Sequence, residues 1–122
     1  MKTTQIMQHL IGKTYKELVD HLRTEEDGGD CCGWSNCYIE NSLVDLKDKA
    51  EAVLVDVVEI DYSDDADSDY SDRSVINFIF DLGDKKGLIL GYDLQAGSGS
   101  GWSYGAYVTL YFDKEEVASA NW

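Results

Sequence analysis

An acidic segment in the middle of the chain, residues 59–72, is the strongest chemical feature of this sequence. It runs from Glu59 to Asp72 and carries seven carboxylates and no basic side chain, within a protein of formal net charge −14. Carboxylates this close repel one another unless water, a metal ion or a basic partner surrounds them. The segment argues against direct binding of nucleic acid or an anionic membrane, and it favours a cation or a basic protein. The residues expected to contact a basic partner are Asp61, Asp64, Asp65, Asp67, Asp69 and Asp72.

The same segment resembles a calcium-binding loop in part. Asp61, Ser63 and Asp65 alternate along the chain as calcium ligands do. A twelve-residue calcium loop also needs glycine at its sixth place and a bidentate glutamate at its twelfth. Here these places hold Ala66 and Asp72. We therefore expect a solvated acidic loop that binds divalent cations weakly, with no built metal site.

The cysteines and histidines could in principle form a zinc site or a catalytic pair. Structural zinc usually takes Cys-x₂₋₄-Cys and His-x₃₋₅-His pairs. Cys31, Cys32 and Cys37 form no such double pair, and His9 and His21 lie far apart in the sequence. Buried thiols are the simpler interpretation. Because no motif joins a nucleophile to a base, we expect neither enzymatic activity nor a cofactor.

A glycine-rich stretch, residues 97–101, is the second candidate site. Successive backbone amides in such a loop can bind an anion, and neighbouring aromatic rings can stack on a nucleobase. The stretch lacks the lysine of a phosphate-binding loop, and a flexible hairpin connection is the alternative. The candidate ligand-binding residues here are Arg73, Gly99, Gly101, Trp102, Tyr104 and Tyr107.

Helical patterns dominate the first 26 residues. Thr14 and Glu17 have the spacing of a capping box, and an amphipathic stripe of Tyr15, Leu18, Val19 and Leu22 follows. After them, apolar runs rich in β-branched residues predict strands, and Asp81–Gly87 has the composition of a hairpin turn. A short strand is expected from Cys37, a short helix from Ser42, and a helix or tail at residues 113–122. The main predicted strands are Val53–Ile60, Val75–Phe80, Leu88–Tyr92 and Tyr107–Phe112.

These elements predict a single α+β domain, residues 1–122, in which N-terminal helices pack on an antiparallel sheet of about four to five strands. No apolar run approaches the ~18 residues of a membrane span, and residues 1–10 do not resemble a signal peptide. Three cysteines suit a reducing compartment better than a secreted scaffold. We therefore expect a cytoplasmic protein.

The sequence contains the triplet Asp30-Cys31-Cys32, accompanied by residues 10–14, residues 38–40 and Asp45-Leu46. In order along the chain, these pieces resemble a family of small, uncharacterised phage and prophage proteins that carry an Asp-Cys-Cys motif. The resemblance covers most of the chain, although the triplet is its most specific part, and it implies no catalytic residues. It implies an accessory protein that acts in the cytoplasm of a bacterial host.

Two functions follow as hypotheses. In the first, the protein is a non-enzymatic DNA mimic whose carboxylates occupy the basic nucleic-acid-binding surface of a host nuclease or defence effector. In the second, a pocket near Trp102 and Tyr104 sequesters a nucleotide immune signal. The first requires a basic host protein as partner and the second a small nucleotide. Self-association into a homo-oligomer stays open.

Overall fold

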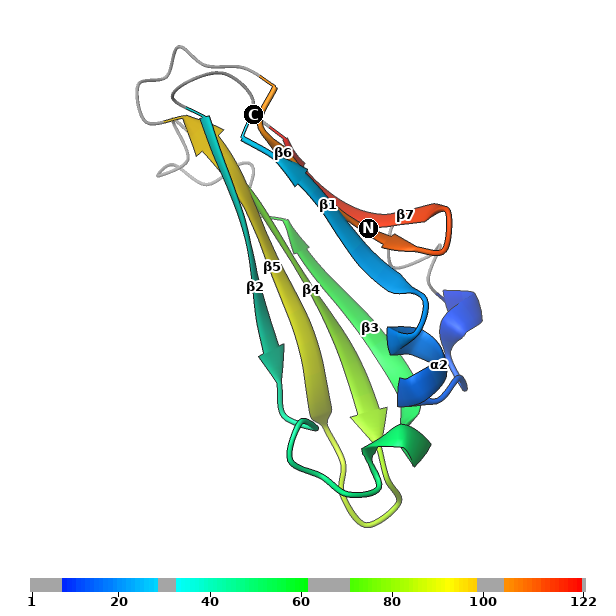
Figure 1. Cartoon of the computed structure of the whole chain (residues 1–122). Coiled ribbons are helices and arrows are strands. Elements are labelled where there is room, and N and C mark those ends of the chain that lie inside the picture. The colour runs from blue at the N-terminus through cyan, green and yellow to red at the C-terminus, as the bar shows by residue number, and fades with distance from the viewer. Residues whose placement is uncertain (1–7, 29–32, 62–70, 99–104, 122) are drawn as a thin grey trace.

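The computed structural model describes residues 8–28, 33–61, 71–98 and 105–121. These residues form seven strands, one short α-helix and two 3₁₀ turns (Figure 1). The helix α2 spans Tyr15–Val19, and the turns η1 and η2 span Gln8–Leu10 and Lys49–Glu51. The strands are β1 Leu22–Asp27, β2 Gly33–Asn41, β3 Val53–Asp61, β4 Ser71–Asp81, β5 Leu88–Ser98, β6 Tyr107–Phe112 and β7 Glu115–Asn121.

The strands form two antiparallel sheets that enclose one core. The four-stranded sheet has the order β2-β5-β4-β3, and the three-stranded sheet has the order β1-β6-β7. The inward side chains of β4 and β5, such as Phe78 and Leu94, are fully buried with Val108 and Leu110 of β6. Helix α2 covers the other end of the same inward side, where the Tyr15 ring meets Phe80 edge-on. Figure 1 shows the sheets side by side, with α2 against the lower part of β3.

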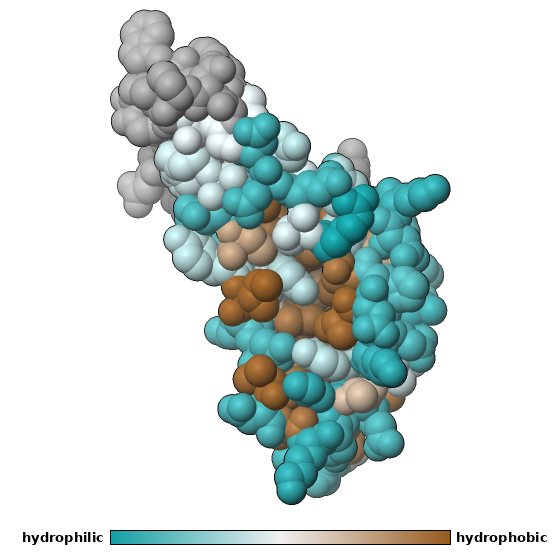
Figure 2. Space-filling view, in the orientation of Figure 1, coloured by the Kyte–Doolittle hydropathy of each residue, from teal (hydrophilic) through white to brown (hydrophobic). Residues whose placement is uncertain are grey.

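The inward side is less completely covered along the β2 edge. In the orientation of Figure 1, hydrophobic residues gather over the middle of the molecule between hydrophilic borders (Figure 2). Ile39 of β2 pairs with the buried Tyr92, yet 59% of Ile39 stays exposed. An edge strand has a neighbour on one side only, so its inward side chains retain more contact with solvent.

The predicted α+β class is wrong, because the protein is mostly β and has two sheets. Only residues 15–19 of the expected N-terminal helices form an α-helix, and Leu22 begins β1 instead. The amphipathic stripe is real for Tyr15 and Leu18, which are both buried. Beyond them, pairing of β1 with β6 outweighs the helical preference of the Glu-rich sequence.

The C-terminal segment also forms a strand where a helix or tail was expected. Asp113 adopts a positive φ of 55° between Phe112 and Glu115, and it reverses the chain there. Strand β7 then pairs with β6 as a hairpin, although its alanines and glutamates favour helices. Hairpin pairing supplies the backbone hydrogen bonds that a short helix would have to make alone.

The short helix expected from Ser42 is also wrong, because residues 42–45 form a turn and only Lys49–Glu51 is helical, as a 3₁₀ turn. Three other local predictions are confirmed. The Glu17 amide donates to Thr14 Oγ1 at 3.3 Å, as the capping box requires. The Asp81–Gly87 turn joins β4 to β5, with the Gly87 amide donating to Asp81 Oδ1 at 3.0 Å. The four predicted strands are present, and β4 and β5 extend beyond their predicted bounds. Among the described residues, no helix is long and apolar enough to cross a membrane.

Candidate functional site

The outward side of the four-stranded sheet, which we call the outer sheet face, carries more apolar side chains than a solvent-facing sheet usually does. Antiparallel sheets with one wet side normally alternate apolar inward and polar outward residues. Here Val58 and Ile60 of β3 point outward, and each is 40% exposed. Their cross-strand neighbours on β4 include Val75, and the half-buried Ile79 extends the same face. Exposed apolar residues that are contiguous in this way typically mark an interaction surface.

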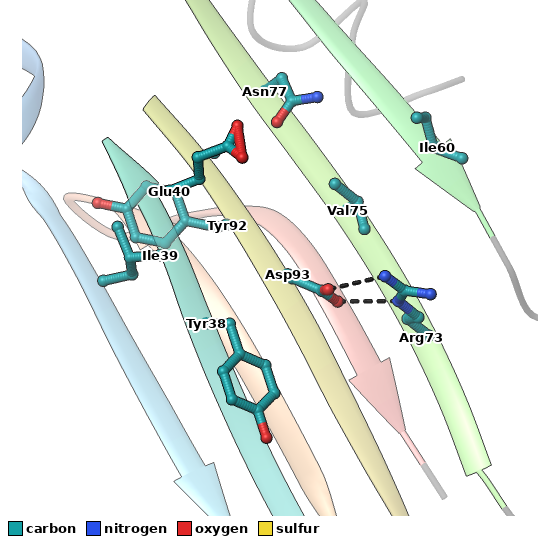
Figure 3. A pocket seen from close by; sticks show the side chains of 10 residues that line it. Tyr38, Ile39, Glu40, Ile60, Arg73, Val75, Asn77, Tyr92 and Asp93 are labelled. Atoms are coloured by element: carbon teal, nitrogen blue, oxygen red, sulfur yellow. Dashed lines mark hydrogen bonds and ion pairs between the residues drawn. The ribbon is translucent and has the colours of Figure 1, made fainter. Parts of the chain in front are cut away.

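A hollow lies in the middle of this face, and the outward-facing Gly91 of β5 is part of its lining. Gly91 pairs with Glu40 of β2 on one side and with Asn77 of β4 on the other. A Cβ at Gly91 would collide with Asn77 Oδ1, so the Asn77 amide takes the space that a side chain there would fill. The resulting pocket, the Gly91 hollow, has a volume of ≈ 390 Å³. Its lining includes Tyr38, Glu40, Ile60, Arg73, Val75, Asn77 and Asp93 (Figure 3).

A bidentate ion pair closes one side of the hollow. Arg73 Nε and Nη2 donate to the two carboxylate oxygens of Asp93 at 3.0 and 2.8 Å. Gln95 Nε2 also donates to Asp93, at 3.2 Å. Burial alone would raise the pKa of Asp93, but the Arg73 and Gln95 hydrogen bonds and the Arg73 charge outweigh it and hold that pKa below its usual range.

The electrostatics of the hollow favour a cation over an anion. Its lining holds the carboxylates of Glu40 and Asp93 against the single guanidinium of Arg73. Two nitrogens of that guanidinium already donate to Asp93. Tyr38 lies on the same face, opposite Asp93, and is 58% exposed. An open tyrosine ring beside carboxylates suits a positively charged group.

Comparisons with protein families, with curated proteins and with solved structures found no match for this chain.

The inward side of β2 and β5, behind the hollow, offers no reactive nucleophile. Cys37 pairs with the buried Leu94, and burial, reinforced by the charges of Glu26 and Asp93, raises the pKa of its thiol to about 11. Burial, with smaller contributions from Cys37 and Tyr15, likewise raises the pKa of Tyr92 to about 12. Both groups are therefore neutral near pH 7, and a neutral thiol is a poor nucleophile.

The structure separates the candidate residues that it describes. Arg73 lines the hollow, whereas Tyr107 begins β6 in the other sheet, opposite Asp27 and Asn121. Asp72 joins the sheets, because its carboxylate accepts the amides of Arg73 at 3.0 Å and Asn121 at 2.9 Å. Asp61 ends β3. The remaining candidates lie outside the described residues: Asp64, Asp65, Asp67, Asp69, Gly99, Gly101, Trp102 and Tyr104.

Sequence reasoning missed most of the hollow. Tyr38, Glu40, Asn77 and Asp93 were not candidates, and Gly91 was treated as an ordinary strand residue. The sequence did carry a signal for the longer strand. Leu90, Tyr92 and Leu94 alternate with polar or small residues, and this alternation continues past Tyr92, where the predicted strand ended. Within the described ranges, no three or more His, Cys, Asp or Glu residues are grouped to hold a metal ion.

Proposed function

We propose that this protein is an acidic, non-enzymatic binding protein that occupies the basic nucleic-acid-binding surface of a partner protein. In this proposal the contact combines the outer sheet face with the acidic segment, residues 59–72. The main support for this proposal is that both ends of the acidic segment adjoin the Gly91 hollow. Strand β3 ends at Asp61 and β4 begins at Ser71, so the chain leaves and re-enters the sheet beside Ile60 and Arg73, which both line the Gly91 hollow.

The two parts of this surface contribute in different ways. Burial of the apolar side chains Val58, Ile60 and Val75 supplies favourable free energy of about 25 cal/mol per Å² of apolar area. Carboxylates steer a basic partner and discriminate against acidic ones, and those of Glu40 and Asp93 line the hollow on this face. A partner that normally releases counterions when it binds DNA gains a comparable electrostatic contribution from this protein.

The resemblance of the sequence to phage and prophage proteins supplies a biological setting. We extend the proposal to an accessory protein that inhibits a host defence effector in the bacterial cytoplasm. Nucleases and other defence effectors have the basic grooves that this mechanism requires. The acidic segment would compete with nucleic acid for such a groove.

Nucleotide sequestration is a second candidate, because Arg73 and Tyr38 both line one pocket. An arginine can bind a phosphate, and an exposed tyrosine can stack on a base. Against this candidate, Arg73 is held by Asp93, and the Glu40 carboxylate lines the same pocket. A phosphate would have to displace Asp93 from Arg73 and would also meet the Glu40 carboxylate in the same pocket. Binding to a basic protein surface is therefore the better supported function.

The test is capture of partners from nuclease-treated bacterial lysate by the immobilised protein, followed by competition. We expect a nucleic-acid-binding protein to be captured and duplex DNA to displace it. Capture should weaken as salt rises, because exposed charges are screened over ~8–10 Å at physiological ionic strength. Capture that duplex DNA in excess leaves unchanged would contradict the proposal, and so would capture of nucleotides without protein.

A charge-matched pair of variants locates the contact. The first variant replaces Asp64, Asp65, Asp67 and Asp69 by asparagine, and it should lose partner affinity while its thermal midpoint stays the same or rises slightly. The control variant removes four exposed carboxylates from the opposite end of the four-stranded sheet. Equal losses of affinity in the two variants would assign the effect to net charge alone. The control positions are Asp45, Asp48, Glu51 and Asp84.

A further inference from the structure

We infer that the Gly91 hollow receives an arginine side chain of the basic partner. The inference rests on the proposed function, since it assumes a partner with a basic surface, and it names the group that enters the pocket. It follows from the shape of the hollow, from its charges and from a comparable arrangement elsewhere in the same molecule.

The comparable arrangement lies on the outward side of the three-stranded sheet. There the Arg23 guanidinium lies 4.6 Å from the centre of the Tyr111 ring. Arg23 Nη1 also donates to Glu25 Oε1 at 2.6 Å. One tyrosine face and one carboxylate, both on a sheet surface, thus hold a guanidinium by a cation–π contact and a charge-assisted hydrogen bond.

The lining of the hollow includes the same two kinds of group, a tyrosine ring and a carboxylate. Tyr38 and Glu40 are two residues apart on β2, so their side chains share the outer sheet face. In the part of the chain that the structure describes, no basic side chain forms an ion pair with Glu40, and none stacks on Tyr38. The nearest guanidinium lining the pocket, that of Arg73, donates to Asp93 instead.

The floor of the hollow suits a flat, hydrogen-bonding group. Gly91 has no side chain, and the Asn77 amide oxygen lies over it, where it can accept a hydrogen bond from an incoming guanidinium. Val75 and Ile60 form an apolar wall that can contact the methylene groups of an arginine. Figure 3 shows Glu40, Asn77 and Val75 around one part of the pocket and the Arg73–Asp93 pair at another.

The first experiment uses blocked peptides that contain a single arginine, lysine or citrulline, titrated into ¹⁵N-labelled protein. We expect saturable shifts of the amides of Tyr38, Glu40, Asn77 and Gly91 with the arginine peptide, weaker ones with lysine and none with citrulline. Citrulline has nearly the shape of arginine without its charge, so it separates recognition of a cation from simple shape. Small, non-saturating shifts spread over the whole acidic surface would overturn the inference.

Three variants sharpen this test. Glu40→Gln should weaken arginine-peptide binding by roughly fivefold or more, the scale of one exposed charge-assisted hydrogen bond. Gly91→Ala should abolish the saturable shifts, because it displaces Asn77 and fills the floor. Glu116→Gln, on the exposed surface of β7, should leave binding unchanged. Equal affinities of wild type and Glu40→Gln would overturn the inference even if Gly91→Ala does not fold.

Partner capture distinguishes failure of this inference from failure of the proposed function. If the arginine peptide does not bind but a basic protein is still captured and displaced by DNA, the inference is wrong and the proposed function stands. If the peptide binds the hollow while no such protein is captured, the proposed function is wrong and the arginine site stands.

Discussion

The two outward sheet surfaces of this protein carry similar residues in different states. On the three-stranded sheet, Arg23 is held between Tyr111 and Glu25 within the chain. On the four-stranded sheet, Tyr38 and Glu40 surround a hollow, and the nearby Arg73 is bound to Asp93. On the first surface a tyrosine and a carboxylate already share an arginine, whereas the second surface is acidic and partly apolar, and its arginine is paired with Asp93. This difference is the reason why we propose the outer sheet face, and not the outward side of the three-stranded sheet, as the binding surface.

The largest predicted effect compares the two sides of the four-stranded sheet. Phe78 is fully buried, so Phe78→Ala should reduce the free energy of unfolding by about 3–5 kcal/mol through cavity formation. Val58→Thr, on the outer sheet face, should change it by less than about 0.5 kcal/mol, as ordinary surface substitutions do. Urea denaturation measures both. A loss at Val58 that approaches the loss at Phe78 would show that the outer sheet face is structural instead of available for binding.

A second effect concerns the inward side of β2, where Cys37 lies. In a Cys31→Ser, Cys32→Ser background, Cys37 should react with iodoacetamide at pH 8 roughly a hundredfold more slowly than a free cysteine, because its raised pKa leaves little thiolate. Above pH ~8.5 the unfolded thiol ionises first, so folding stability should fall as the pH approaches about 11. Mass spectrometry of alkylation against pH is the measurement. Rapid reaction at pH 8 would contradict the inward placement of Cys37.

The smallest effect compares the two arginine–carboxylate pairs. A double-mutant cycle on Arg73 and Asp93 should give a coupling free energy of about 1 kcal/mol, because the pair is bidentate and the Asp93 side chain is partly buried. The more exposed Arg23 and Glu25 should give less than about 0.5 kcal/mol.

The pH dependence of the Arg73–Asp93 coupling provides a check. The folded-state pKa of Asp93 is depressed, so its contribution to stability is complete above the ordinary carboxyl pKa of about 4. That contribution should disappear as the pH falls through the lower folded value. Coupling that stays constant into strong acid would show that it does not come from the ionised Asp93 carboxylate.

The sequence predicted the parts of the fold that depend on local pattern. The apolar runs from Val53, Val75, Leu88 and Tyr107 form strands, and Thr14 caps the first helical turn as expected. Strands β1 and β7 could not be found in this way. Their acidic and alanine-rich sequences favour helix or coil, and both become strands through pairing with β6, which is a tertiary effect.

The candidate site was predictable only in part, for a related reason. Arg73 stood out as one of two arginines, but its ion pair with Asp93 depends on the register between β4 and β5. The Gly91 hollow depends on that register and also on the pairing of β5 with β2. These pairings join residues far apart in the sequence, and periodicity within a single strand does not specify them.

The most direct test of the account is methyl NMR of isoleucine-labelled protein during titration with the captured basic partner. Ile60, Ile79 and Ile89 lie on the outer sheet face, and Ile76 lies on the inward side of β4 as a matched internal control. We predict large, salt-sensitive shifts of the three outward methyl groups and little change at Ile76. A partner that binds while the methyl signals of Ile60, Ile79 and Ile89 stay unchanged would contradict the account.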